Sequence, residues 1–325
     1  MDRAIVVSQQ GGPEVLEWTQ KDPGEPGPGE VLVRHTAVGL NFIDVYHRTG
    51  LYPLDPPFTP GVEGAGVVEA IGEGVSELST GDRVAYTGNG PVGSYCEGRV
   101  LPSSRLYKLP DEVSNDTAAA IMLKGCTVEY LVRRTYPVSS GDWVLLHAAA
   151  GGVGLIASQW AKSIGAKMIG TASTREKARL ALRNGCKHVI DTSNQDIAKE
   201  VMRLTNGQGV DVVFDSVGHD QWTASLASVR KYGLIILFGS ASGKAPPLDL
   251  WEDGAKTASY FIRAKAANYL FDANSRRKSA RHLFRMIRSG EIKIKIGQTY
   301  PLKDAARAHR DAEARRTVGS TVLVP

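Results

Sequence analysis

The sequence is poor in cysteine and has no long apolar run, no internal repeat and no low-complexity tract. Its 325 residues include three cysteines, Cys96, Cys126 and Cys186, which are dispersed along the chain. An odd, dispersed set argues against a disulfide framework and is typical of a reducing compartment. No apolar stretch approaches the ~20 residues that a membrane helix needs. The first 15 residues have no long apolar core, which argues against a signal peptide. We therefore expect a cytoplasmic protein that does not span a membrane.

The charge balance is only slightly basic. Lysine and arginine total 39 against 34 acidic residues, a formal net charge of +5. A mildly basic soluble protein and a protein with a basic patch for an anionic ligand would both give this balance. Hydrophobic residues at 42% and charged residues at 22% are typical of a globular protein. The chain is long enough for about two domains.

The two parts of the chain have different patterns. The first 120 residues contain short apolar runs separated by glycine and proline clusters, which predicts a small β-barrel or sandwich. From residue 142 strands and helices alternate, which predicts a doubly wound parallel sheet and an α/β fold. Expected strands are 143–146, 167–171, 188–190, 210–214, 234–238, 258–264 and 321–324. Expected helices are 152–164, 174–184, 197–204, 222–230 and 275–288, and a last helix is expected after a cap at 301–304. The last strand is expected to rejoin the first domain.

A glycine-rich loop follows the first strand of this alternating region and opens a helix. The candidate ligand-binding residues are Ala150, Gly151, Gly152, Val153 and Gly154. Glycine allows a tight turn and a close backbone approach to a pyrophosphate, and the helix N-terminus adds N–H donors. A tight turn without a ligand is the alternative. The strand–loop–helix context favours a dinucleotide site.

The second strand of the region lacks the acidic residue that an NAD site places about 20 residues beyond the glycines. Ser173, Arg175 and Lys177 stand there instead. A hydroxyl and two cations suit a 2′-phosphate, although a solvated first helical turn could also carry these cations. Cations are disfavoured at a helix N-terminus, so their presence favours a nearby anion. The pattern predicts NADPH.

Five segments spread along the chain form a recognisable set. They are residues 11–16 (GGPEVL), 39–44 (GLNFID), 81–84 (GDRV), 141–155 (GDWVLLHAAAGGVGL) and 214–218 (FDSVG). Together they resemble the quinone oxidoreductase/ζ-crystallin branch of the medium-chain dehydrogenases/reductases. The resemblance implies a GroES-like β-barrel domain of residues 1–123 and 267–325, and a Rossmann domain of residues 124–266. It also implies a homodimer in which the strand at 258–264 pairs across a two-fold axis.

Zinc alcohol dehydrogenases of this superfamily hold a catalytic metal with an early cysteine, a histidine in a Gly-His-Glu motif and a later cysteine. Here Asn41 stands at the first position and Val62 at the second. A catalytic zinc needs three protein ligands. With two of them replaced, we predict no metal.

The resemblance also implies roles at the catalytic centre. It places Asn41 and Tyr46 against the cofactor or substrate, and Thr127 against the nicotinamide. Asn41, Tyr46 and Tyr52 are neutral donors that could stabilise a developing oxyanion, although Tyr52 equally suits a packed turn. Lys124 would attract a substrate oxygen or form a salt bridge.

On the cofactor side, the resemblance implies that Phe238, Gly239 and Ser240 contact the nicotinamide. It places Arg316 in a C-terminal segment that returns to the cofactor, although a surface role suits Arg316 nearly as well. Thr192 aligns with an aromatic residue that lies beside the adenosine phosphate in close relatives. Threonine cannot stack, so affinity would depend more on the residues after the second strand.

These residues together predict a zinc-independent NADPH:quinone oxidoreductase. Reduction of an activated C=C bond, as in enones or enoyl thioesters, needs the same hydride delivery and remains an open alternative. A non-enzymatic role, as an RNA-binding or crystallin-like structural protein, is the third reading. The basic helix at 275–288 could serve RNA or form an ordinary solvated face. We expect a small electrophilic substrate, a homodimer, and no membrane or nucleic-acid partner.

Overall fold

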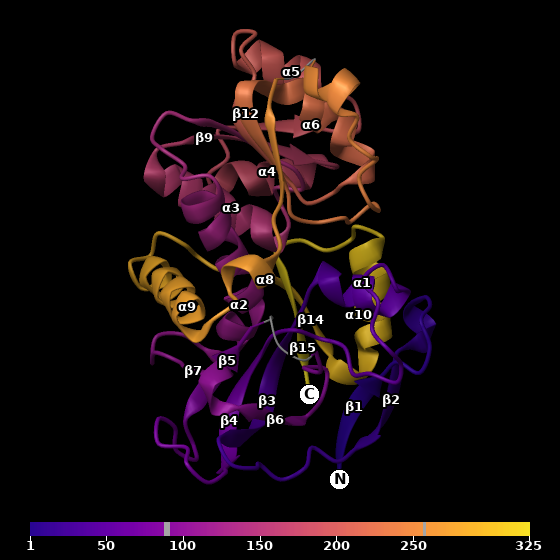
Figure 1. The fold of residues 1–325 in the computed structure, drawn as a ribbon, viewed down its shortest axis with the longest axis vertical. Helices are drawn as coiled ribbons and strands as arrows, with labels where there is room; N and C mark the ends of the chain where they lie inside the picture. Colours follow the sequence, from indigo (N-terminus) through magenta and orange to yellow (C-terminus); the bar gives the residue numbers. More distant parts are fainter. Residues whose placement is uncertain (88–91, 256–257) are drawn as a thin grey trace. The chain divides into compact units, whose positions relative to one another are not determined.

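The computed structural model describes residues 1–87, 92–255 and 258–325, which divide into two compact units (Figure 1). Unit 1 comprises Met1–Cys126, Tyr269–Arg288 and Ile294–Pro325. Unit 2 comprises Thr127–Asn268 and Ser289–Lys293. In these ranges, no helix is both long and apolar enough to cross a membrane.

Unit 2 contains a six-stranded, fully parallel sheet. Its strands are β8 (Trp143–Leu146), β9 (Lys167–Ala172), β10 (His188–Asp191), β11 (Val210–Asp215), β12 (Val229–Leu237) and β13 (Tyr260–Arg263). Their spatial order is β10-β9-β8-β11-β12-β13. The order reverses between β8 and β11, so the loops that leave these two strands diverge at their carboxyl ends. In doubly wound sheets this is where ligands bind.

Four helices connect these strands. They are α3 (Gly152–Ile164), α4 (Arg175–Arg183), α5 (Ile197–Leu204) and α6 (Trp222–Ser228). Helices α5 and α6 contribute Ile197, Val201 and Trp222 to a core with Leu145 and Val213 of the sheet. Unit 2 also contains η3 (Leu131–Thr135), η4 (His219–Gln221) and η5 (Leu250–Gly254), and α8 (Ala266–Tyr269) ends at the unit boundary. The alternating strand and helix prediction is confirmed.

One boundary in this region was predicted wrongly. The expected helix 222–230 ends at Ser228, and β12 begins at Val229 instead of Leu234. Val229 is buried and pairs with Val210, and the pairing register then shifts before Val212. Burial against the neighbouring strand therefore overrides the local helical pattern.

Unit 1 is built on a seven-stranded, mostly antiparallel sheet. The order is β14-β15-β3-β4-β5-β7, with β6 also paired to β3, while β1 and β2 form a separate pair. The strands are β1 (Asp2–Val6), β2 (Glu17–Lys21), β3 (Glu30–Leu40), β4 (Gly64–Ile71), β5 (Arg83–Tyr86), β6 (Gly98–Pro102), β7 (Tyr107–Lys108), β14 (Ile296–Pro301) and β15 (Ser320–Val324). C-terminal β15 pairs antiparallel with β3, so the chain end rejoins the first domain as predicted.

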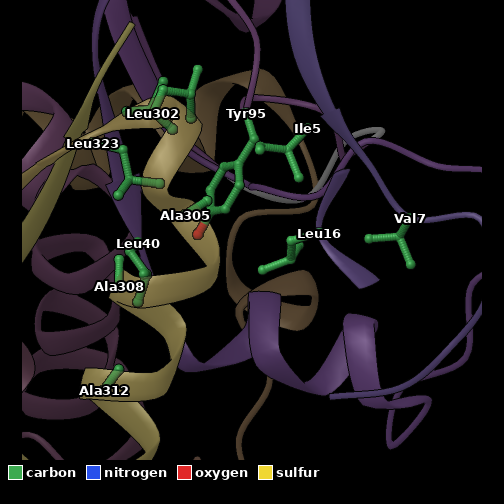
Figure 2. Packing of buried hydrophobic residues seen from close by; sticks show 11 residues of the cluster. Ile5, Val7, Leu16, Leu40, Tyr95, Leu302, Ala305, Ala308, Ala312 and Leu323 are labelled. Carbon is green, nitrogen blue, oxygen red and sulfur yellow. The ribbon is translucent and has the colours of Figure 1, made fainter. Parts of the chain in front are cut away.

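The helices of unit 1 include two that the sequence did not predict, α1 and α2. The helices are α1 (Phe42–Thr49), α2 (Asn115–Tyr130, which continues into unit 2), α9 (Ala273–Arg288) and α10 (Ala305–Glu313), with the short turns η1 (Pro13–Val15), η2 (Ser103–Arg105) and η6 (Leu302–Asp304). Figure 2 shows Ala305, Ala308 and Ala312 of α10 facing a core that includes Leu323 and Tyr95. Small alanine side chains allow α10 to pack closely there, and this fixes the position of α10 in unit 1.

Candidate active site

The glycine loop joins β8 to α3. Ala148 has a positive φ of 54°, and Gly151 caps α3 in an extended conformation. A Cβ on Gly154 would lie 2.7 Å from the Ala148 carbonyl oxygen, so only glycine lets the first helical turn pack this closely. The first N–H groups of a helix have no partner inside it. Gly152, Val153 and Gly154 therefore offer donors and the positive end of the helix dipole to an anion.

The segment after β9 begins α4 with polar residues. Ser173 and Arg175 are exposed and Lys177 is half-buried. The Thr174 hydroxyl caps the helix by accepting the Lys177 N–H at 3.2 Å. Thr192 donates its N–H to the last carbonyl of β9 at 2.9 Å. Hydroxyls and cations therefore gather at the ends of β9 and β10.

One carboxylate stands near these cations. Asp191 ends β10, and its carboxylate accepts the backbone N–H and the hydroxyl of Ser193. These hydrogen bonds lower the pKa of Asp191, and the charge of Arg175 adds to the effect. Part of the Arg175 charge is therefore already compensated by Asp191.

A chain of buried polar side chains lies behind the glycine loop and links the ends of β11, β8 and β9. Ser225 Oγ donates to Asp215 Oδ2 at 2.8 Å, and His147 Nε2 lies 3.0 Å from Ser225 Oγ. On the other side of the ring, His147 Nδ1 lies 3.3 Å from Thr171 Oγ1. Thr171 Oγ1 in turn accepts the N–H of Ala148 at 3.2 Å. This series of hydrogen bonds ends at the backbone of Ala148 in the glycine loop.

The proton positions in this chain follow from the donor inventory. Ser225 gives its one hydrogen to Asp215, so its oxygen accepts the Nε2 hydrogen of His147. The Nδ1 atom of His147 therefore carries no proton and accepts the Thr171 hydroxyl. Burial lowers the pKa of His147, which agrees with a neutral ring. Each side chain in this series of hydrogen bonds thus has one tautomer or rotamer in which its hydrogen bonds are all formed.

Asp215 also holds two segments beyond the chain. Its Oδ1 accepts the N–H groups of Val217 at 2.8 Å and Gly218 at 2.9 Å. Its backbone oxygen accepts the N–H of Phe238 at 2.8 Å and of Gly239 at 3.4 Å. The turn after β11 and the segment after β12 are therefore fixed by the same residue that anchors the loop.

Asn41 and Lys124 are brought together in unit 1 by a buried carboxylate. Glu63 Oε1 accepts Asn41 Nδ2 at 2.7 Å and Lys124 Nζ at 2.9 Å. Its second oxygen accepts the Leu123 N–H at 2.6 Å, and Lys124 also donates to the Leu40 carbonyl at 3.1 Å. All three side chains are buried. Of the two roles open for Lys124, the structure shows the salt bridge.

A second hydrogen-bonded chain holds the start of α1, where Asn41 lies. Arg48 donates to His309 Nδ1 at 3.2 Å, so the Nε2 hydrogen of His309 points at the Tyr95 oxygen, 3.1 Å away. Tyr95 then donates to Asp44 Oδ2 at 3.1 Å. The same Asp44 oxygen accepts the backbone N–H of Asn41 at 2.8 Å. The position of Asn41 is thus tied to α10.

Burial shifts the pKa values of the groups in this chain. It raises the pKa of Asp44 to about 7, against the opposing hydrogen bonds from Asn41 and Tyr95. Burial lowers the pKa of His309 to about 3, and the adjacent Arg48 charge acts in the same direction. Arg48 is itself buried and donates to both oxygens of Glu313, at 2.6 and 3.0 Å. A neutral His309 therefore sits beside a compensated cation.

The two candidate tyrosines form one aromatic cluster. The rings of Tyr46 and Tyr52 meet edge to face with centroids 5.0 Å apart, and the Tyr52 N–H donates to the Tyr46 carbonyl at 3.1 Å. Phe42 adds a third ring, 6.2 Å from Tyr46. Tyr52 thus packs in a turn, one of the two roles predicted for it.

The remaining candidates lie at separate places. Ala150 is buried in the glycine loop, Thr127 is buried in α2, and Ser240 is buried after β12. Arg316 is exposed and donates to Asp311 at 2.9 Å, an arrangement typical of a surface ion pair. The cofactor role of these four residues stays a prediction.

Several site residues were missed from the sequence. Glu63 stood in the Gly61-Val62-Glu63 motif that we used only to judge the zinc site. His147 and Asp215 lay inside recognised segments, but nothing in the linear pattern says that they share one hydrogen-bonded chain. Among the described residues, no group of three or more histidine, cysteine and acidic side chains could hold a metal ion.

Comparison with known proteins agrees with this architecture. Residues 27–111 match the family described as alcohol dehydrogenase GroES-like domain, and residues 152–271 match the family described as zinc-binding dehydrogenase. A quinone oxidoreductase of Pseudomonas aeruginosa is 48% identical over the whole of both chains. A 2-haloacrylate reductase of Burkholderia is 42% identical over 100% of this chain and 99% of its own. The crystal structure of Escherichia coli quinone oxidoreductase complexed with NADPH has a TM-score of 0.96 and 41% identity over 99% of this chain and all of that one.

A GroES-like domain combined with a doubly wound nucleotide-binding sheet defines a medium-chain dehydrogenase/reductase. Within that class, the full-length identity shows that the chain belongs to the quinone oxidoreductase family of enzymes.

The buried chain behind the loop yields a stability prediction. Replacing Thr171 by valine leaves the buried His147 Nδ1 without a partner and removes the side-chain acceptor of the Ala148 N–H. We expect the free energy of unfolding to fall by about 1–3 kcal/mol, the usual cost of an unsatisfied buried group. Denaturant unfolding followed by circular dichroism measures it. Thr171→Ser keeps the hydroxyl and is the control. A valine variant as stable as the serine variant would contradict the hydrogen-bond assignment.

Proposed function

We propose that the chain is a zinc-independent reductase that transfers hydride from NADPH to a quinone. The observation that carries the proposal is the glycine loop at the switch point of the sheet, followed after β9 by hydroxyls and cations in place of an acid. Unit 2 is the proposed cofactor domain and unit 1 the proposed substrate domain. The relatives named as quinone oxidoreductases support the acceptor, and the related structure complexed with NADPH supports the cofactor.

The residues of unit 2 fit NADPH. Gly154 has no Cβ, so the first turn of α3 packs directly against the Ala148 and Ala149 carbonyl groups and holds the loop in a shape that suits a pyrophosphate. Ser173 would donate to the 2′-phosphate and Lys177 would neutralise it, with Arg175 in support. NADPH supplies the hydride when bound. The chain must hold the cofactor, exclude water and stabilise charge on the acceptor.

The residues of unit 1 suit an acceptor that becomes an oxyanion. Tyr46 and Tyr52 are the proposed neutral hydrogen-bond donors, and Asn41 lies in the same unit with its amide donating to Glu63 and Gly39, which fix its orientation. Preorganised donors of this kind lower the energy of developing negative charge. Because Glu63 also compensates Lys124, that ammonium would act mainly by holding the carboxylate.

Zinc does not fit this site, although one matching family is described as zinc-binding. A catalytic zinc requires three ligands such as His, Cys or carboxylate. Asn41 and Val62 stand at two of the expected ligand positions, and the Asn41 amide is already bonded to Glu63. Alcohol oxidation would lose the metal that lowers the hydroxyl pKa. Reduction of an electron-poor quinone needs no such help.

Reduction of an activated C=C bond is the second candidate reaction. The 42% identity to a protein named 2-haloacrylate reductase favours it specifically. The same donors would stabilise the enolate oxygen that hydride addition produces.

A steady-state panel separates the two reactions. With NADPH saturating, we expect kcat/KM for 1,4-benzoquinone and 1,4-naphthoquinone to exceed that for 2-cyclohexenone and 2-chloroacrylate. The electron-poor quinone ring needs the least assistance from a protein without a Lewis acid. Higher kcat/KM for the alkenes would replace the quinone proposal with the second candidate. No NADPH oxidation with either class would refute both.

The 2′-phosphate assignment is tested on α4. Lys177→Ala should raise the KM for NADPH about tenfold or more, since a hydrogen bond to a charged group contributes about 1.5–3 kcal/mol. The KM for NADH should hardly change. Arg179→Ala removes an exposed cation from the same helix and is the matched control. Equal effects of Lys177→Ala on both cofactors would rule out a 2′-phosphate contact.

We also propose a homodimer that forms through β13. This strand is last in the order of the unit 2 sheet, and its Tyr260 and Ile262 side chains are exposed. Large exposed apolar side chains on a sheet edge mark a surface for strand pairing. Ile262→Asp should yield a monomer in sedimentation equilibrium. Leu182→Asp, on exposed α4, should leave a dimer. A wild-type monomer would refute the proposal.

The cytoplasm is the proposed location. Cys96, Cys126 and Cys186 are all unpaired with one another and buried. Free thiols suit a reducing compartment.

A further inference from the structure

A surface cavity of 510 Å³ in unit 1 lies outside the residues discussed so far. One side is α9, and the other is formed by residues around η2 and β7. Leu78, Leu106 and Phe284 form apolar parts of its wall. Arg277, Arg281, Arg285 and Arg288 of α9 and Lys108 of β7 also line it, against a single acidic residue, Glu77.

The four arginines share one face of α9. They recur at intervals of four, four and three residues, which places them on one side of a helix. Helix α9 contains no acidic residue to compensate them. Like charges at these spacings destabilise a helix. The arrangement therefore favours an anion from outside the helix.

The two end arginines are compensated by the neighbouring structure. Arg277 pairs with Glu77 at 3.1 Å, and Arg288 lies 3.9 Å from Glu112. Lys108 pairs with Asp82 at 2.7 Å. The first two of these ion pairs hold the two end arginines of the row.

The two middle arginines differ from those at the ends. Within residues 1–87, 92–255 and 258–325, neither Arg281 nor Arg285 has a hydrogen-bond or ion-pair partner. Both are exposed and line the cavity. They lie one helical turn apart, a spacing at which two guanidinium groups can bind the same anionic group. The flanking ion pairs limit this uncompensated charge to a short stretch.

We propose that this cavity binds a small organic anion whose charged group, a phosphate or a carboxylate, is held by Arg281 and Arg285 and whose apolar body lies against Leu78, Leu106 and Phe284. A nucleic acid would instead require a continuous run of available cations along the surface. The short unpaired stretch and the apolar wall both favour a small amphipathic ligand. The residues that line this cavity all belong to unit 1, and none of them is among the residues of the proposed dinucleotide site.

Octyl phosphate is a suitable probe because it combines a phosphate with an apolar chain. Its binding to the full chain is measured by isothermal titration calorimetry, with NADP⁺ saturating so that the dinucleotide site is occupied. Inorganic phosphate supplies the charge alone and octanol the chain alone. We expect octyl phosphate to bind at least tenfold more tightly than either. Octyl carboxylate in place of the phosphate shows which charged group is preferred.

The variant Arg281→Gln/Arg285→Gln should weaken octyl phosphate binding at least tenfold. The control Lys303→Gln/Arg310→Gln removes two exposed charges elsewhere in unit 1 and should bind as the wild type does. Equal binding by both variants, or equal binding of octyl phosphate and inorganic phosphate, would overturn the proposal. So would tight binding of a single-stranded RNA oligonucleotide with no binding of octyl phosphate. Quinone reductase activity measured alongside separates a failure of this site from a failure of the proposed function.

Discussion

The neutral state of His147 is the constraint on which the dinucleotide-binding half of the chain depends. Its ring accepts a hydrogen bond from Thr171 on one side and donates one to Ser225 on the other. Ser225 in turn donates to Asp215. A protonated ring would turn the Nδ1 acceptor into a donor, so the Thr171 hydroxyl hydrogen would lose its acceptor. Because these hydrogen bonds join the ends of three strands, the glycine loop, the end of β9 and the turn after β11 take up their positions together.

Unit 1 uses the same principle with different residues. A neutral His309 between Arg48 and Tyr95 orients the hydrogen bonds that reach Asp44 and Asn41. Each unit thus positions its candidate site with a buried histidine whose two nitrogens have opposite roles. Rigid support of this kind suits a reaction that depends on orientation and preorganised donors without metal chemistry.

Much of unit 2 could be predicted because its strands are short apolar runs followed by glycine or polar turns, as at Val144 before the glycine loop. The helix α2 was missed because it is apolar on most sides and shows no amphipathic period. The start of β12 was missed because its pairing with Val210 depends on a distant strand. The same limit hid the buried chains, since His147, Thr171 and Ser225 become neighbours only through the order of the strands.

Transfer of hydride from NADPH to a quinone is the reaction that we propose for this chain. The most direct measurement is an anaerobic reaction of the purified protein with NADPH and 1,4-benzoquinone, in which nicotinamide oxidation and hydroquinone formation are followed together. We expect one hydroquinone to form for each NADPH oxidised, at a rate far above that without protein. A rate no faster than the reaction without protein would contradict it.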